Sequence, residues 1–104
     1  LIDPIDNKKI KFIKLSANEY LHGTNSKKLN NIKFNHKMRL IPSIKDLINN
    51  ASIKYYSPLV HNNKLFKKGF NNYQGIIKVD NIIYKYIIRI GIAKHDYIFY
   101  DLTL

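Results

Sequence analysis

The chain has 104 residues, with 18 Lys and Arg against 7 Asp and Glu, which gives a formal net charge of +11 at pH 7. Its length fits one domain with a modest core, and a hydrophobic content of 45% excludes a disordered tail. No apolar run reaches the length of a membrane-spanning helix, and the lack of cysteine excludes disulfides and thiolate metal sites. The positive charge favours a polyanionic partner, which can be nucleic acid, an anionic membrane surface or an acidic protein.

We expect residues 1–104 to form a single domain. Because the chain begins with Leu1 rather than Met, we expect it to be a piece of a longer protein. The four histidines show no metal-ligand spacing, so we expect neither a metal nor another cofactor. Only two arginines, Arg39 and Arg89, occur beside sixteen lysines. In a chain that prefers lysine so strongly, each arginine marks either a place that needs a planar, bidentate donor or an ordinary surface ion pair.

The N-terminal part of the chain predicts a strand and a short helix. Residues Leu1–Asn7 form a lead-in, and the alternation of lysine with apolar residues over Lys8–Leu15 predicts a half-exposed strand. Ser16–Glu19 has the pattern of a capping box, which starts a short helix that ends near Gly23.

The middle of the chain predicts further helix and one strand. Ile32–Leu40 is ambiguous, with helix favoured slightly. Over Pro42–Ala51 the apolar residues share one helical stripe, at Ile44, Leu47, Ile48 and Ala51. Ser52–Val60 predicts a strand limited by Pro58, and His61–Gly69 predicts a basic loop or hairpin.

Tyr73–Lys94 predicts two long strands joined by a tight turn at Asp80 and Asn81, because both residue types tolerate the positive φ of a two-residue hairpin. This turn sets the register, and we expect the following pairs to line the core: Val79 with Ile82, Ile77 with Tyr84, Gly75 with Tyr86, and Tyr73 with Ile88. The opposite face carries Asn72, Gln74, Ile76, Lys78, Ile83, Lys85, Ile87 and Arg89. The cations on that face indicate either a solvated sheet surface or a surface for phosphates.

Tyr97–Leu104 predicts a last strand after a turn at His95 and Asp96. Strict alternation directs Ile98, Tyr100, Leu102 and Leu104 to the core, and Tyr97, Phe99, Asp101 and Thr103 to the face of Arg89. The predicted fold class is α+β, with one or two N-terminal helices packed on a four- to five-stranded antiparallel sheet whose other face stays partly open.

The residues available for chemistry are mostly basic, aromatic or hydroxylic. Acids are few and scattered, and the sequence has no Gly-rich phosphate loop and no nucleophile elbow. This set suits metal-independent cleavage of RNA, in which the 2′-hydroxyl attacks, a side chain takes its proton and cations stabilise the phosphorane. The cationic stretch His36–Arg39 offers His36 as the acid or base, with a plain surface histidine as the alternative. Tyr97, Phe99 and Tyr100 are candidates either for base stacking or for the core.

Several features follow one another in an order that resembles a known group of nucleases: His36-Lys37-Met38-Arg39, the helix Pro42–Ala51, the strand-turn-strand around Asp80-Asn81, and the closing Tyr100-Asp101. Over residues 30 to 104 this order is similar to the phage- and toxin-associated nuclease domains grouped with barnase, EndoU, RelE and the tRNA-cleaving colicins. More narrowly, it resembles the nuclease domains at the ends of large polyvalent phage, plasmid and conjugative-element proteins, which implies that the chain is the C-terminal domain of a larger protein. The resemblance implies a small ribonuclease fold of helices and an antiparallel sheet.

The resemblance also implies which residues act. It implies catalytic roles for His36, Arg89, Tyr100 and Thr103, whereas Leu102 stands where relatives often have a histidine. The residues expected to contact nucleic acid are Lys37, Arg39, Gln74, Lys78 and Lys85.

The function implied is that of a toxic, metal-independent endoribonuclease, with tRNA as one candidate substrate. Such a domain acts in the bacterial cytoplasm, is delivered as a secreted or translocated effector, and is neutralised by an acidic immunity protein or antitoxin. No membrane partner is expected. Two alternatives stay open, which are a non-catalytic nucleic-acid-binding module and a basic interaction domain that binds an acidic protein.

Overall fold

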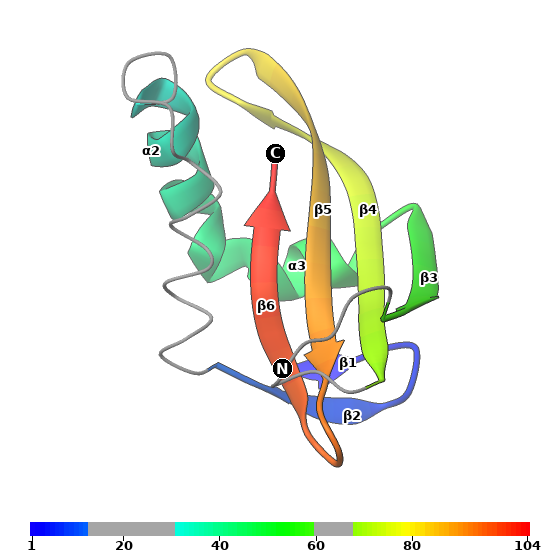
Figure 1. Cartoon of the computed structure of the whole chain (residues 1–104). Coiled ribbons are helices and arrows are strands. Elements are labelled where there is room, and N and C mark those ends of the chain that lie inside the picture. Colours follow the sequence, from blue (N-terminus) through cyan, green and yellow to red (C-terminus); the bar gives the residue numbers. More distant parts are fainter. Residues whose placement is uncertain (13–30, 60–67) are drawn as a thin grey trace.

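The computed structural model describes residues 1–12, 31–59 and 68–104, which form an α+β fold (Figure 1). A bent helical stretch lies against a curled six-stranded sheet, and it consists of α2 (Asn31–Leu40), the 3-10 turn η1 (Ile41–Ser43) and α3 (Ile44–Asn49). The strands are β1 (Ile2–Asp3), β2 (Lys8–Lys11), β3 (Ile53–Pro58), β4 (Gly69–Val79), β5 (Ile82–Ile92) and β6 (Tyr97–Thr103). The predicted helix starting at Ser16–Glu19 and most of the predicted basic segment His61–Gly69 lie outside the described residues.

The sheet runs in the order β1-β2-β6-β5-β4-β3 and is mixed, because β2 pairs parallel to β6 while the other pairs are antiparallel. The expected antiparallel arrangement is therefore correct for β3 to β6 and wrong at the N-terminal edge. The lead-in contributes the additional strand β1, since Asn7 adopts a positive φ of 56° and the chain folds Ile2–Asp3 back onto β2. The parallel pair joins Ile10 to Tyr97, and local alternation in sequence carries no information about so distant a partner.

A buried carboxylate fixes this N-terminal edge to the sheet. Asp3 is completely buried, and it accepts hydrogen bonds from the Tyr73 hydroxyl, from the Asn71 side-chain amide (3.1 Å) and from the Ile5 backbone N–H (2.9 Å). Burial and this carboxylate both raise the pKa of Tyr73, with burial the larger cause. Because a buried carboxylate is tolerated only when it is well hydrogen-bonded, this contact set explains why the lead-in docks as a strand.

The central hairpin has the predicted turn and register. Asp80 and Asn81 have φ values of 48° and 66°, which is the left-handed conformation that a two-residue turn of this kind requires. Every predicted pair between β4 and β5 is present, from Val79 opposite Ile82 to Tyr73 opposite Ile88. The side chains of this face line the core, apart from Ile82, which is 42% exposed beside the turn.

The helical stretch covers the core face of the hairpin. Its predicted apolar stripe supplies Ile44, Leu47 and Ile48, all of which are buried. Gly75 lies against the ring of Tyr86, and a Cβ at this glycine would come within 2.4 Å of the Tyr86 hydroxyl oxygen. The glycine therefore makes room for the aromatic ring, whose hydroxyl donates a 2.6 Å hydrogen bond to the Leu47 carbonyl oxygen of α3.

The last strand departs from strict alternation because it contains a β-bulge. Arg89 of β5 pairs with Asp101 while the next residue of β5, Ile90, pairs with Phe99, so Tyr100 is the additional residue. A bulge places two consecutive residues opposite one residue of the partner strand and shifts the alternation beyond it. The prediction that Tyr100 faces the core is accordingly wrong, since its ring contacts Phe70 and the Arg89 guanidinium. The prediction that Phe99 faces away from the core is wrong for the same reason, because Phe99 belongs to the buried core cluster.

Candidate functional site

Two groups of polar side chains flank helix α2. The helix lies beside the C-terminal half of β6, and the tip of the β4–β5 hairpin curls towards it (Figure 1). One group, which we call the Arg89 face, comprises Arg89, Asp101, Tyr100 and Phe70 on the sheet face opposite α3. The other, which we call the hairpin latch, comprises His36 and Arg39 of α2 with Asp80 and Tyr84 of the hairpin.

The Arg89 face is organised by a bidentate ion pair. The Nε and Nη2 atoms of Arg89 donate hydrogen bonds of 3.0 and 2.9 Å to the two carboxylate oxygens of Asp101. The Arg89 side chain is 40% exposed and that of Asp101 is 15% exposed, so the carboxylate holds the guanidinium from the inner side. The guanidinium carbon lies 5.8 Å from the centre of the Tyr100 ring, and this ring lies 5.1 Å from that of Phe70. The bulge thus produces a fixed cation beside a pair of aromatic rings.

Lys37 of α2 belongs to the same electrostatic neighbourhood. Its side chain is buried, with 3% exposure, and burial lowers the pKa of its ammonium group below the ordinary value. The negative charge of Asp101 acts in the opposite direction on this pKa, and the positive charge of Lys33 lowers it further. A buried amine whose pKa is lowered by burial and that interacts with a nearby carboxylate is typical of functional sites.

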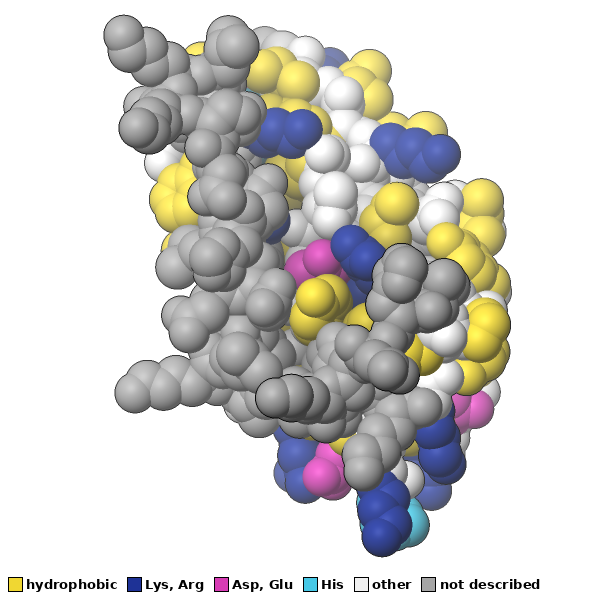
Figure 2. All heavy atoms as spheres, viewed as in Figure 1, with side chains coloured by type: hydrophobic (Ala, Val, Ile, Leu, Met, Phe, Trp, Pro, Cys, Tyr) yellow, Lys and Arg dark blue, Asp and Glu magenta, His cyan; other side chains and the backbone are white. Residues whose placement is uncertain are grey.

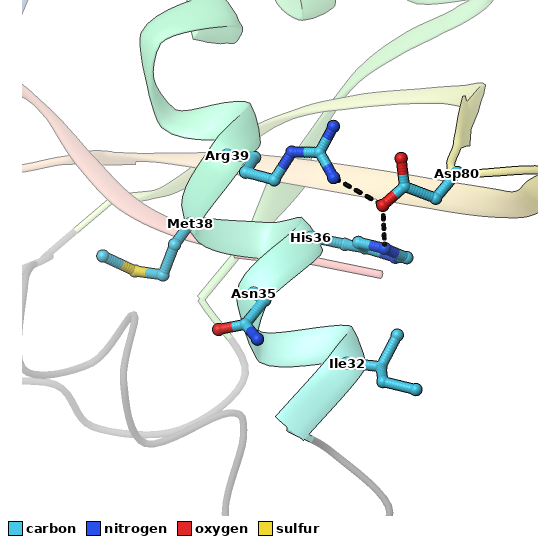
Figure 3. A pocket seen from close by; sticks show the side chains of 6 residues that line it. All are labelled: Ile32, Asn35, His36, Met38, Arg39 and Asp80. Atoms are coloured by element: carbon cyan, nitrogen blue, oxygen red, sulfur yellow. Dashed lines mark hydrogen bonds and ion pairs between the residues drawn. The ribbon is translucent and has the colours of Figure 1, made fainter.

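The hairpin latch joins α2 to the turn of the hairpin (Figure 3). The His36 ring is buried, with 4% exposure, and its Nδ1 lies 2.7 Å from the Tyr84 hydroxyl while its Nε2 lies 3.2 Å from a carboxylate oxygen of Asp80. Arg39 donates a hydrogen bond of 2.6 Å to the same oxygen. The Arg39 guanidinium is the main cause that lowers the pKa of Asp80, and His36 contributes to the same shift.

An open groove of about 620 Å³ runs past this latch along α2. The described residues that line it are Ile32, Asn35, His36, Met38, Arg39 and Asp80. In the close view His36 and Arg39 point towards Asp80, whereas Asn35 and Met38 point away from it (Figure 3). The groove therefore follows the outer side of the helix rather than forming a closed cavity around the latch.

The structure distributes the predicted site residues over these two groups. Arg89 and Tyr100 lie together on the Arg89 face, and Lys37 is coupled to them through Asp101. By contrast, His36 and Arg39 lie in the latch. Among the described residues, the ring nitrogens of His36 contact Tyr84 and Asp80, and neither contacts Arg89.

The remaining predicted residues lie on the same sheet face as Arg89. Thr103 is exposed opposite Ile87, and Gln74 donates a hydrogen bond of 2.8 Å to the Tyr55 hydroxyl. Lys78 and Lys85 are exposed nearer the hairpin turn, where they alternate with two exposed isoleucines, Ile76 and Ile83. Figure 2 shows this face, on which separate Lys or Arg side chains lie between hydrophobic ones rather than in one dense basic patch.

Sequence reasoning missed three members of these groups. Tyr84 was expected only as a core residue, and its hydroxyl contact with His36 has no local sequence signal. The contact of Phe70 with Tyr100 depends on the bulge, which local alternation does not reveal. Asp101 was noted as half of the Tyr100-Asp101 motif, and the scarcity of acids could have marked it as the partner of one of the two arginines.

Within the described parts of the chain, no group of three or more His, Cys, Asp or Glu side chains could hold a metal ion. No helix in those parts is long and apolar enough to cross a membrane. Comparisons with protein-family models, with curated proteins and with solved structures gave no match. The function is therefore argued from the geometry of the two groups.

Proposed function

We propose that this chain is a metal-independent endoribonuclease whose active surface is the Arg89 face. The observation that supports the proposal best is the Arg89 guanidinium, which Asp101 holds by two hydrogen bonds beside the Tyr100 ring. A cation fixed in advance stabilises developing phosphate charge without reorganising during the reaction. The adjacent ring offers a stacking surface for an unpaired base, which is how proteins commonly bind single-stranded RNA.

The reaction needs only groups that RNA and this face supply. The 2′-oxygen of one nucleotide attacks the adjacent phosphorus, its proton passes to a protein base, and the P–O5′ bond breaks. The leaving 5′-oxygen takes up a proton, and the products are a 2′,3′-cyclic phosphate and a 5′-hydroxyl. In this scheme Arg89 stabilises the charge on the non-bridging phosphate oxygens, and Asp101 positions Arg89.

Lys37 is the group that we assign to proton transfer. Because burial lowers its pKa, a larger fraction of its amine is neutral at a given pH than for an exposed lysine. A neutral amine can accept the proton of the 2′-hydroxyl, and the resulting ammonium can donate to the leaving oxygen. Asp101, which is coupled to both Lys37 and Arg89, stabilises the protonated form.

The rest of the sheet face can bind the RNA on either side of the scissile phosphate. Lys78 and Lys85 are exposed on the same face as Arg89, where they can contact backbone phosphates. Gln74 and Thr103 lie between them and Arg89 along the strands and offer hydrogen bonds to sugar or phosphate. The RNA would run along β4 and β5 from the hairpin turn towards Tyr100.

The biological setting that we propose follows the resemblance of the sequence to toxin-associated nuclease domains. The chain would act as a toxic effector on RNA in the bacterial cytoplasm, and an acidic immunity protein or antitoxin would neutralise it. The net charge of +11 is compatible with both partners.

Cleavage kinetics of variants test the proposal. The double variant Arg89→Gln with Asp101→Asn replaces both partners of the ion pair and so leaves no unpaired carboxylate. We expect its cleavage rate on single-stranded RNA in EDTA to fall about 100-fold or more. The matched control is Lys94→Gln, which removes one exposed positive charge near the turn between β5 and β6 and should change the rate by less than about twofold. Unimpaired cleavage by the double variant would exclude the Arg89 face as the active surface.

A second candidate function is non-catalytic binding of RNA by the same face. The exposed Lys78 and Lys85 favour it, because cations on a sheet face can bind backbone phosphates whether or not the face is catalytic. This alternative predicts salt-sensitive RNA binding, weakened by Lys78→Gln and Lys85→Gln, without any cleavage.

A further inference from the structure

We infer that His36 is a positioning residue, which holds α2 at the rotation that brings Lys37 to Asp101. This inference rests on the proposed function, and it assigns to the buried histidine a role other than direct proton exchange with RNA. The sequence alone made His36 the candidate acid or base, but the contacts of both its ring nitrogens, with Tyr84 and Asp80, point to a different task.

Both ring nitrogens of His36 have a hydrogen-bond partner. Because Arg39 lowers the pKa of Asp80, this carboxylate is ionised and can only accept hydrogen bonds. The His36 Nε2 atom, 3.2 Å from Asp80, must therefore carry a proton. In the neutral ring Nδ1 then accepts from the Tyr84 hydroxyl at 2.7 Å, and the two rings meet edge to face. Each ring nitrogen therefore contacts a side chain of the β4–β5 hairpin.

Polar contacts help to orient helix α2, because among its described side chains Leu40 is the buried apolar one and Phe34 is half-buried. Among its side chains that the structure describes, His36, Lys37 and Leu40 are the buried ones, and only Leu40 is apolar. A helix with so narrow an apolar stripe is not fixed in rotation by the hydrophobic effect alone. The polar contacts of His36 supply the missing restraint.

Neighbouring residues on a helix point about 100° apart, so fixing one side chain sets the direction of the next. With His36 directed at Asp80 and Tyr84, the next side chain, Lys37, is held in a buried position where the charge of Asp101 acts on it. The latch thereby couples the hairpin turn to the Arg89 face. Misplacement of a catalytic group by about 1 Å can cost about 100-fold in rate, so this restraint matters for catalysis.

Two substitutions of His36 separate positioning from proton transfer. A glutamine amide can replace the Nε2–H donor to Asp80 but cannot exchange protons near neutral pH. We therefore expect His36→Gln to keep about a tenth or more of the wild-type kcat on a fluorogenic RNA oligonucleotide, with an unchanged shape of the pH–rate profile, whereas His36→Ala should lose about 100-fold with little change in KM.

A third substitution avoids any perturbation of the core. Asp80 is exposed and has a positive φ, so Asp80→Gly removes the carboxylate while glycine keeps the turn conformation. We expect kcat to fall about three- to tenfold without a change in the pH–rate profile. The control is Asp46→Asn, which removes an exposed carboxylate of α3 outside the latch and should leave kcat unchanged.

The outcomes are distinguishable from failure of the proposed function. If His36→Gln is as inactive as His36→Ala, retains its thermal stability and loses one limb of the pH–rate profile, His36 itself exchanges the proton and the inference is overturned. Full activity of both His36 variants would overturn it as well. If the wild-type chain does not cleave RNA, the NMR signals of the Lys37 side chain still report on the latch. These signals should shift in Asp80→Gly and stay in place in Asp46→Asn. No shift in Asp80→Gly would overturn the inference.

Discussion

Replacing Lys37 by methionine should make the protein more stable and less active. At pH 7 folding has to transfer the Lys37 ammonium group from water into a site that is only 3% exposed, and the nearby Asp101 offsets part of this cost. Methionine has a similar length and no charge to desolvate, and Asp101 keeps its two hydrogen bonds from Arg89. Replacing a whole buried ion pair by apolar residues is often neutral or stabilising by about 1–4 kcal/mol, whereas removing one partner destabilises when it leaves the other charge unpaired. Because Asp101 remains paired with Arg89, we expect a gain of about 1 kcal/mol for Lys37→Met.

The size of this gain in stability depends on pH. Because the folded state lowers the pKa of Lys37 from 10.5, the unfolded chain binds more protons between the lowered value and 10.5. The stability of the wild-type protein should therefore rise with pH in that window, and the advantage of Lys37→Met should shrink there and vanish above it.

Thermal and urea unfolding at pH 7 measure the change. A gain of about 1 kcal/mol corresponds to an increase in Tm of roughly 4–8 °C for a domain of this size. The control, Lys45→Met, replaces an exposed lysine of α3 and should change the stability by less than about 0.5 kcal/mol. A loss of stability in Lys37→Met would refute the reasoning, because it would show that the buried ammonium contributes a net favourable interaction. RNA cleavage by the same variant should fall about 100-fold.

Two further predictions concern the sheet. Burial, and then the hydrogen bond donated to Asp6, raise the pKa of Tyr97 to about 12, so the stability that this contact provides should be complete below pH 10 and decline as the pH rises towards 12. Urea unfolding at a series of alkaline pH values should show a shallower decline for Tyr97→Phe, and an identical decline would contradict the assignment. Gly75→Ala places a methyl group against the Tyr86 ring and should displace its hydroxyl from the Leu47 carbonyl, at a cost of about 1–3 kcal/mol in urea unfolding. A stability equal to that of the wild type would show that the ring moves aside freely.

The hairpin was predictable because its information is local. The pair Asp80-Asn81 tolerates positive φ, and the apolar alternation on either side has a period of two, so the turn and the pattern agree on one register. The helix at Ile44–Asn49 was predictable for a similar reason, since its apolar stripe follows a proline that suits a helix start.

The N-terminal edge and the last strand were not predictable from local patterns. The parallel pairing of β2 with β6 joins the two ends of the described chain. The bulge at Tyr100 changes the face of every residue on one side of it, and no residue type at that position requires a bulge. An alternation rule applied without the bulge directs Tyr100 into the core and away from Arg89.

The candidate site was predictable in its parts but not in its grouping. The rarity of arginine in a lysine-rich chain marked Arg89 and Arg39 as bidentate or ion-paired positions. Each of them forms an ion pair with an aspartate. His36 and Lys37 are neighbours in sequence, yet the helix sends them to different groups. Their burial depends on the hairpin and on β6, which lie more than forty residues further along the chain.

The chemistry at the RNA ends tests the central claim most directly. Wild-type protein and the double variant Arg89→Gln with Asp101→Asn would be incubated with single-stranded RNA in EDTA, and the fragment ends would be mapped. The proposed function predicts fragments that end in a 2′,3′-cyclic phosphate and begin with a 5′-hydroxyl, formed by the wild type and not by the folded double variant. Absence of cleavage by the folded wild type, or fragments that carry a 3′-hydroxyl and a 5′-phosphate, would contradict it.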